Sequence, residues 1–390
     1  MMRPVISSTA LAALLIAGTA IAAPSEQSDA QQAAPPAVTS GSAPSAPTTS
    51  AAPVAADAST TPPASAASTA PPAAKLSPAD QKRLEAIQQY QHDLVSVVAL
   101  RADSDYLLGA AILAKPFENQ TPGLDFDALS QRAAAAPSAG SAPRWERLSA
   151  CKSKDDCPNA DAYAYLRKQA ADNAAVWIVA MDLAAQNHDG KAERVALQKV
   201  AAAETYDDYY GKALAGVAKA TAVLPPLADT MQGAHDDQPD NPDGVRVLVA
   251  VNATEAHLRP DLDPVLKFCS KDAVARDKGS RNACLKLAHT LQWGSSPMAR
   301  AAGLHIQAEL VPVDKAQDEQ ASRDLAWQVH QYSGLLQRAL VDPSLAAQWL
   351  ASARNGGTEL SLILATLRTN HVPTDAPSGA TPASAGSGGQ

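Results

Sequence analysis

The chain has few aromatic residues, no excess of basic charge and no cysteine in its N-terminal third. Phe, Trp and Tyr make up 4% of its 390 residues, which excludes an aromatic-rich β-sandwich and a multi-pass membrane protein. The 40 acidic residues outnumber the 32 basic ones, and the formal net charge is −8. Because a duplex-binding protein needs a basic face that neutralises phosphates, we predict no nucleic-acid partner and no electrostatic attraction to anionic lipid.

The sequence also lacks the short motifs of common enzyme classes. It contains no GxSxG, GxxxxGK[ST] or GxGxxG, and none of its eight histidines lies in an HExxH spacing. The acidic loop 235–244 fits a calcium loop only with Pro239 and Ala250 at the terminal ligand positions, and neither residue supplies a carboxylate. A scattered histidine such as His305 is expected to be packed or solvated. We therefore predict no catalytic residue, no metal site and no cofactor.

Residues 1–22 have the features of a secretory signal peptide. Arg3 precedes an apolar run from Leu11 to Ile21, and small residues at positions 20 and 22 indicate cleavage after Ala22. An uncleaved membrane anchor is the alternative, because the run approaches the roughly 20 residues of a membrane span. No cysteine stands near the cleavage site to accept a lipid. We expect a periplasmic or secreted protein with no membrane span after cleavage.

Two segments are rich in small polar residues and proline. Residues 23–74 are almost wholly Pro, Ala, Ser and Thr, and residues 373–390 have a similar composition. A stretch without large apolar side chains buries too little surface to offset its ordering entropy, so both segments are predicted to be disordered. The first is interpreted as a linker that spans the cell wall or leads away from a surface, or as a leader with no selected role.

Residues 75–372 are expected to form an all-α domain of short antiparallel helices. Glycine follows Trp293 and Asn355, where a helix end favours a left-handed residue. The apolar run 245–251 is predicted to be helical, since a lone strand has no partner. Asp261 and Asp263 are interpreted as turn and N-cap residues rather than a catalytic pair. Predicted helix starts, in which a capping Ser or Asp precedes proline, are Ser77-Pro78, Asp263-Pro264, Ser296-Pro297 and Asp342-Pro343.

One hairpin carries a family resemblance. Trp177 lies in a first helix, the small Ala184 and Ala185 follow two turns later, and an Asp-Gly turn at 189–190 leads into an alanine-bearing second helix. Residues 174–203 thus resemble a degenerate tetratricopeptide-type hairpin. The whole chain also resembles exported helical-repeat proteins of Gram-negative envelopes. These resemblances imply stacked hairpins in a TPR-like α-solenoid, a concave surface for a protein partner and a periplasmic address.

The four cysteines form an even set, which in an exported chain favours disulfides. Three pairings are possible, and the sequence-local pairs Cys151–Cys157 and Cys269–Cys284 are the simplest. The alternative is a Cys284 thiol nucleophile activated by His289. Residues five apart on one helix are poorly placed for contact, so disulfides are favoured.

Three tyrosines gather at 206–210. Tyr206, Tyr209 and Tyr210 are candidates for contacting a peptide or glycan, because tyrosine offers rigid apolar area with a polar tip. In the alternative, Asp207 or Asp208 caps a helix while the first and last tyrosines pack on the preceding hairpin. Five separated tryptophans are predicted to anchor the interhelical core: Trp145, Trp177, Trp293, Trp327 and Trp349.

These features predict an exported, disulfide-bonded helical scaffold that acts through a protein partner in the periplasm or cell envelope. One alternative is a cell-wall glycan or peptide hydrolase on a helical scaffold. It requires carboxylates or histidines from different helices to meet in one cleft with shifted pKa values. The other alternative is a tethered structural or stress protein, which predicts an evenly polar surface without an apolar groove.

Overall fold

The computed structural model describes residues 76–117, 120–151, 157–231, 240–276 and 279–377. By its internal contacts the chain divides into two units, Met1–Leu76 and Ser77–Gln390, and the description concerns the second. The predicted signal peptide 1–22 and linker 23–74 lie outside the described residues.

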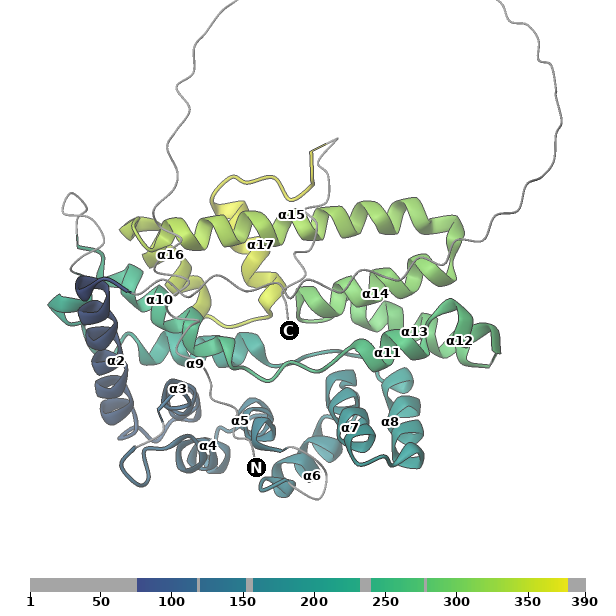
Figure 1. The fold of residues 1–390 in the computed structure, drawn as a ribbon, viewed down its shortest axis with the longest axis horizontal. Coiled ribbons are helices and arrows are strands. Elements are labelled where there is room, and N and C mark those ends of the chain that lie inside the picture. The colour runs from purple at the N-terminus through teal and green to yellow at the C-terminus, as the bar shows by residue number, and fades with distance from the viewer. Residues whose placement is uncertain (1–75, 118–119, 152–156, 232–239, 277–278, 378–390) are drawn as a thin grey trace, which may run out of the picture. The chain divides into compact units, whose positions relative to one another are not determined.

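The described residues form an all-α structure (Figure 1). Within them, the isolated bridge between Asn173 and Thr205 is the one β-type pairing. The α-helices are α2 (Pro78–Val98), α3 (Ser104–Ala114), α4 (Phe126–Ala135), α5 (Ala142–Arg147), α6 (Ala160–Gln169), α7 (Ala174–Gln186), α8 (Gly190–Ala202), α9 (Tyr210–Ala220), α10 (Pro242–Glu255), α11 (Asp263–Phe268), α12 (Lys271–Arg276), α13 (Ser280–Gln292), α14 (Pro297–Leu310), α15 (Lys315–Ala339), α16 (Pro343–Arg354) and α17 (Glu359–Thr369). The 3-10 helices are η1 (Leu148–Ala150), η2 (Ala228–Thr230) and η3 (Pro312–Asp314).

Most of the predicted helix starts are confirmed. The side chains of Ser77, Ser296 and Asp342 each accept a hydrogen bond from a backbone N–H in the first turn of α2, α14 and α16. The N-cap at Asp263 is wrong: Leu262 is the N-cap of α11, and Asp263 is its first residue. Asp261 Oδ1 already accepts the Asp263 N–H at 2.9 Å, so the chain turns one residue earlier. The run 245–251 is helical within α10, as predicted.

The two predicted glycine helix ends differ. Gly356 has a φ of 74° after α16, which confirms the left-handed residue expected there. Gly294, after α13, is not in the left-handed region, so that prediction is wrong. A Cβ at this position would lie 3.0 Å from both Ala299 Cβ and Tyr206 Cδ1. Glycine is therefore needed at 294 for close packing rather than for its backbone angle.

Consecutive helices pack as neighbours, but contacts also join helices far apart in sequence (Figure 1). The predicted hairpin is α7 and α8, and Asp189 caps α8 by accepting the Ala192 N–H at 3.0 Å. Helix α9 packs against α3, α10 and α16. The α3–α9 contact brings two backbones together at Gly109 and Gly216, where a Cβ on Gly109 would lie 2.2 Å from the Gly216 oxygen. The contacts of α9 therefore extend beyond those of a stack of neighbouring hairpins.

The tryptophans are only partly core residues. Trp145, Trp177 and Trp349 are buried, as predicted. Trp327 is half-buried, and Trp293 is 80% exposed, so the prediction is wrong for Trp293. The buried residues of α13 include positions 284, 287, 288 and 291, which repeat every three or four residues, and the C-cap position 293 falls off this stripe.

Two disulfides are present, joining Cys151 to Cys157 and Cys269 to Cys284, the two sequence-local pairs. Disulfides are typical of an oxidising compartment, so their presence indicates one for this chain. No helix among the described residues is both long enough and apolar enough to span a membrane.

Residues just after 372, at the start of the predicted disordered segment 373–390, are bonded to α15, and residues 378–390 lie outside the described residues. Trp327 Nε1 donates to the Pro373 oxygen at 3.0 Å, and Gln328 Nε2 donates to the Thr374 oxygen at 2.8 Å. The Ala376 N–H donates to an α15 carboxylate oxygen at 2.9 Å. Polar side chains of α15 supply these bonds, so the start of the segment 373–390 does not depend on apolar burial.

Candidate functional site

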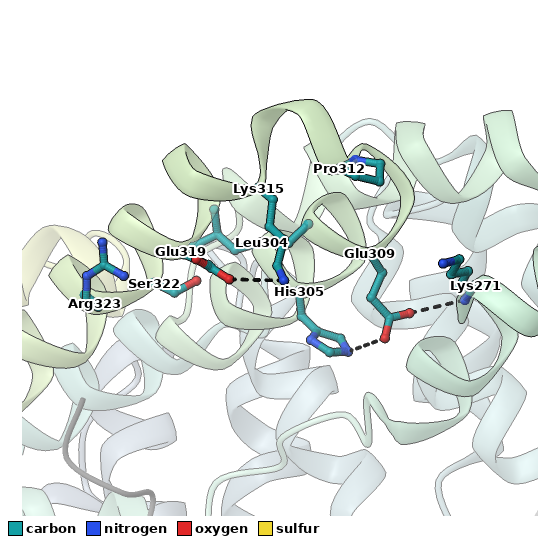
Figure 2. A pocket seen from close by; sticks show the side chains of 10 residues that line it. Lys271, Leu304, His305, Glu309, Pro312, Lys315, Glu319, Ser322 and Arg323 are labelled. Atoms are coloured by element: carbon teal, nitrogen blue, oxygen red, sulfur yellow. Dashed lines mark hydrogen bonds and ion pairs between the residues drawn. The ribbon is translucent and has the colours of Figure 1, made fainter. Parts of the chain in front are cut away.

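A cavity with a volume of about 770 Å³ lies between α14 and α15 (Figure 2). We call it the α14–α15 groove. Helix α14, the short η3 and the first half of α15 supply most of its wall, and α12 adds one residue. The lining residues are Lys271, Leu304, His305, Ala308, Glu309, Pro312, Lys315, Glu319, Ser322 and Arg323.

Local sequence features place these side chains. Ser296 caps α14, and Pro312 lies in the 3-10 turn that reverses the chain into α15. Leu304 is 5% exposed and packs with Leu325 and Leu360 in a small apolar cluster. The groove therefore has an apolar base, while charged side chains from both helices stand around it (Figure 2).

The two acids of the α14–α15 groove already have partners. Glu309 lies 3.5 Å from His305 Nε2 and also accepts the backbone N–H of Lys271 at 3.2 Å. Glu319 lies 3.5 Å from Lys315 Nζ, one helical turn away. His305, for which a packed or solvated role was expected, is exposed and pairs with an acid. Glu319 therefore has a cationic partner, whereas Glu309 is held by an imidazole and a backbone N–H.

Two cations of the α14–α15 groove have no such partner. Among the described residues, no carboxylate lies within ion-pair distance of Lys271 Nζ or of the Arg323 guanidinium, which donates to Gln320 Oε1 instead. The two residues lie on opposite sides of the view in Figure 2. The groove therefore has an apolar base and two cations that form no ion pair among the described residues.

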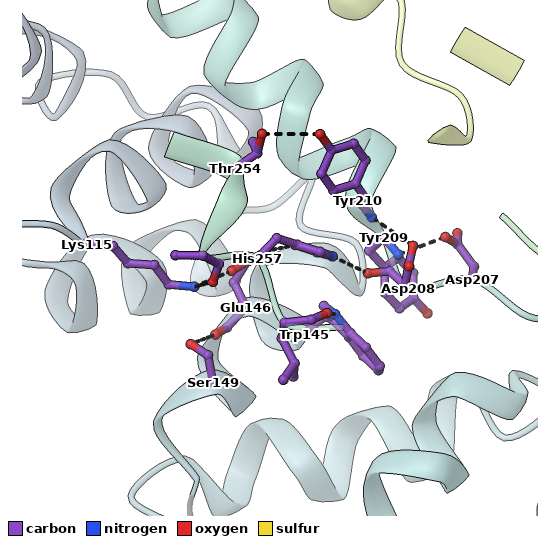
Figure 3. A network of polar contacts seen from close by, with 12 residues as sticks. Lys115, Trp145, Glu146, Ser149, Asp207, Asp208, Tyr209, Tyr210, Thr254 and His257 are labelled. Carbon is purple, nitrogen blue, oxygen red and sulfur yellow. Dashed lines mark hydrogen bonds and ion pairs between the residues drawn. The ribbon is translucent and has the colours of Figure 1, made fainter. Parts of the chain in front are cut away.

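A second cluster, which we call the buried network, centres on Glu146 and His257 (Figure 3). Their side chains are 1% and 0% exposed, and His257 Nδ1 pairs directly with Glu146 Oε1. Lys115 Nζ lies 2.8 Å from Glu146 Oε2. His257 Nε2 lies 2.8 Å from the backbone oxygen of Asp208. Because one ring nitrogen faces a carboxylate and the other a carbonyl oxygen, both donate, and the ring is an imidazolium.

The shifted pKa values of this pair agree with that charge state. Burial alone would raise the pKa of Glu146, but His257 and Lys115 together lower it from 4.5 to about 2. Burial alone would lower the pKa of His257, but the Glu146 carboxylate and Asp208 raise it above its ordinary value of 6.5. A carboxylate between two cations is the stable state of this site.

The segment before α9 completes the buried network. Asp208 Oδ1 accepts from Ser295 Oγ at 3.0 Å, while its Oδ2 is buried without a partner in the described part of the chain. Burial raises the pKa of Asp207, whose Oδ1 accepts the Tyr209 N–H at 2.8 Å. Tyr209 is the N-cap residue of α9, with a φ of 60° and no side-chain cap. Neither acid is the N-cap residue, but Asp208 Oδ1 accepts the N–H of Tyr210, the first residue of α9, at 3.3 Å, so Asp208 does bond to the start of the helix as predicted.

The three tyrosines proposed for partner contact turn into the structure. Tyr206 is 5% exposed and packs in the apolar cluster that includes the α7–α8 hairpin. Tyr209 contacts Trp145, with ring centroids 5.5 Å apart. Tyr210 packs on His257 at 5.4 Å and not on the hairpin as predicted. Contact of these tyrosines with a partner stays a prediction, and we do not base a function on it.

The buried network supplies the acid–histidine cluster that the hydrolase alternative requires, but not the cleft. Glu146 and His257 come from different parts of the chain and have shifted pKa values. Neither residue lines either described cavity. Sequence reasoning missed both, because each is an isolated charged residue outside any motif and they are 111 positions apart. Both side chains lie enclosed between packed segments of the chain.

No metal-binding group of three or more His, Cys, Asp or Glu side chains occurs among the described residues. Comparisons of the chain with protein-family models, with curated proteins and with solved structures find no match. The functional conclusion therefore rests on the geometry of the chain itself.

Proposed function

We propose that this chain is an exported, non-catalytic scaffold that binds an extended acidic segment of a protein partner in the α14–α15 groove. The observation that carries the proposal is the pair of unneutralised cations, Lys271 and Arg323, beside an apolar base. Charge complementarity favours a partner segment with acidic residues that pair with these cations. Apolar side chains between those acids would lie against Leu304 and Ala308.

The setting of the proposal is the cell envelope. The disulfides support an oxidising compartment, and the predicted signal peptide 1–22 and linker 23–74 would deliver the helical domain to the periplasm or cell surface. The tetratricopeptide-like α7–α8 hairpin and the implied α-solenoid belong to the same proposal, because stacked hairpins commonly present partner-binding surfaces.

The two alternatives are less well supported. For a hydrolase, Glu146 and His257 supply shifted pKa values, yet both side chains are enclosed and substrate has no path to them through either described cavity. A structural or stress protein predicts an evenly polar surface, whereas the α14–α15 groove combines apolar area with paired and unpaired charges. Partner binding therefore accounts for both the apolar base and the charged residues of the α14–α15 groove, which the two alternatives do not.

Site-specific photo-crosslinking in cells tests the proposal. A photoreactive amino acid replaces Ser322, which lines the groove and is exposed, or Gln88, an exposed residue of α2 that serves as the matched control. We expect a discrete adduct from position 322 and none from position 88. Adding Lys271→Glu and Arg323→Glu should remove the adduct, because the partner's acids would then meet like charge.

Circular dichroism and thermal unfolding establish that the charge-reversal variant is folded. Equal adducts from positions 322 and 88, or an adduct that survives charge reversal in the folded protein, would contradict the proposal.

A further inference from the structure

A second cavity of about 290 Å³ lies between α6 and the α7–α8 hairpin. We call it the hairpin cavity. Its apolar wall includes Trp177, Leu183 and Val195, and its polar residues include Arg167 and Asn187. Val195 is 47% exposed and supplies apolar area that a ligand could cover. The cavity is separate from the α14–α15 groove, and the inference below does not depend on the function proposed there.

Arg167 is held at this cavity by two aromatic rings. Its guanidinium carbon lies 5.2 Å from the centroid of Trp177 and 5.4 Å from that of Tyr163. The indole is fixed in turn, because Trp177 Nε1 donates to the Ala171 oxygen at 2.8 Å. Within the described chain, the Arg167 guanidinium has neither a hydrogen-bond acceptor nor a carboxylate within ion-pair distance. Arg167 is an exposed residue, so its planar donor group is positioned by the rings while its N–H groups face solvent and are open to a ligand.

A second donor of the hairpin cavity lacks an acceptor. Asn187 Nδ2 is buried and has no hydrogen-bond partner among the described residues. A buried donor without an acceptor is unfavourable, and such groups are rare in folded proteins. Asn187 lines the cavity although Nδ2 itself is closed to solvent, so a rotation of the amide would bring this donor to the accepting oxygen of a bound group.

The charge around the hairpin cavity is positive. Lys191 lines it, and Lys199 Nζ lies 5.8 Å from the Trp177 ring centroid, with no ion pair to either lysine in the described part. Asp189 is the one acid of the lining, and its Oδ1 is engaged as the cap of α8. Arg167 and Lys199 therefore both lie near the Trp177 ring, and neither forms an ion pair among the described residues.

We propose that the hairpin cavity binds a small organic carboxylate with an apolar body. The carboxylate oxygens would accept hydrogen bonds from Arg167 and Asn187 Nδ2, and the apolar body would lie against Trp177 and Val195. The volume is at the low end for ligand cavities, which favours a free small acid over a segment of a folded partner. Arginine suits this role because its fork matches the two oxygens of a carboxylate.

Calorimetric titration of the purified full-length protein tests the proposal, with 3-phenylpropionate as the probe and its amide, 3-phenylpropanamide, as the uncharged match. We expect the acid to bind at least about tenfold more tightly than the amide, since only the acid makes charge-assisted bonds. Arg167→Gln and Asn187→Asp should each weaken acid binding about tenfold or more. Lys168→Gln removes an adjacent exposed charge outside the lining and should leave binding unchanged.

Three results would overturn the assignment once thermal unfolding shows that the variants are folded. They are no heat of binding with millimolar 3-phenylpropionate, equal affinity for acid and amide, or unchanged affinity in both Arg167→Gln and Asn187→Asp. A peptide ending in phenylalanine with a free carboxyl group provides the last arm. Tighter binding of this peptide than of the free acid would assign the site to a peptide terminus and contradict the small-ligand proposal.

Discussion

His257 and Glu146 form an ion pair that is closed to solvent although 111 residues separate them in the chain. Glu146 belongs to α5, His257 follows α10, and the other ring nitrogen of His257 binds the oxygen of Asp208 just before α9. One buried pair thus joins three segments that no local interaction would bring together. Because both groups are desolvated, removal of either leaves the other as an uncompensated charge.

Glu146→Ala is expected to lower the free energy of unfolding by about 3–5 kcal/mol, because it leaves His257 and Lys115 without their shared carboxylate. Urea denaturation followed by circular dichroism measures the change. The control is Asp161→Ala, which removes the 71% exposed partner of Arg147 and should cost about 0–1 kcal/mol. Equal losses in the two variants would show that the buried pair contributes no more than a surface one.

Stability should depend on pH at both ends of the range. The pKa of Glu146 is lowered from 4.5 to about 2, so its contribution is present above pH 4.5 and is lost as the pH falls toward 2. The pKa of His257 is raised above 6.5, so its contribution is full below pH 6.5 and is lost as the pH rises through the folded-state pKa.

Urea unfolding at a series of pH values checks this dependence. The wild-type protein should lose stability above pH 6.5, and His257→Gln should flatten that alkaline decline because the residue no longer titrates. His330→Gln, at an exposed position of α15, is the matched control and should retain the wild-type profile. An unchanged alkaline decline in His257→Gln would assign the pH dependence to other groups.

Gly109→Ala is expected to destabilise the protein by about 1–3 kcal/mol, because the added Cβ would lie 2.2 Å from the Gly216 oxygen and push α3 away from α9. Gly334→Ala is the matched control: it lies in α15 with nothing within 4 Å of its Cβ, and alanine favours a helix over glycine by up to about 1 kcal/mol. The midpoint temperature of thermal unfolding should therefore fall in Gly109→Ala and rise in Gly334→Ala. A neutral Gly109→Ala would contradict the close approach of the two helices.

The two disulfides should contribute unequally. Replacing Cys269 and Cys284 together by alanine opens a loop with a sequence separation of 15, which in the chain-entropy model costs about 3 kcal/mol. The same change at Cys151 and Cys157 opens a separation of only 6 and should cost less, about 2–2.5 kcal/mol. Guanidinium denaturation measures the free energy of unfolding lost in each variant. A larger loss in the Cys151 and Cys157 variant would contradict the prediction.

Export predicts a mature chain that begins at Ala23. Intact-mass measurement of the protein from the periplasmic fraction should show loss of residues 1–22. Ala22→Asp should block cleavage and leave the precursor, whereas Ser28→Asp, beyond the cleavage site, should be processed normally. A periplasmic protein that retains residues 1–22 would support the membrane-anchor alternative instead.

Sequence reasoning succeeded where the deciding contacts are local. The caps at Ser77 and Ser296 depend on a side-chain oxygen and an N–H three residues later, so the pattern predicts them directly. The Cys269–Cys284 pair joins positions only 15 apart, and its proximity also follows from the sequence. The sequence-based prediction failed at Trp293, because the exposure of this residue depends on which face of α13 packs against neighbouring helices.

The candidate site shows the same division. His305 and Glu309 pair across one helical turn, and that spacing can be read from the sequence. The packing of α14 against α15 places Lys271 and Arg323 around one groove, and the sequence does not show this packing. The stacking of Arg167 on Trp177 likewise needs the packing of α6 against the hairpin.

By itself, the sequence determined the helical class, three of the four predicted helix starts and the simplest cysteine pairing, because these follow from side-chain chemistry over a few residues. The tertiary structure decided which isolated charges meet, as Glu146 and His257 do, and which cations stay unpaired. The physical reason is that the energy of a charge depends on its burial and its neighbours in space. Distant segments supply those neighbours only after the helices have packed.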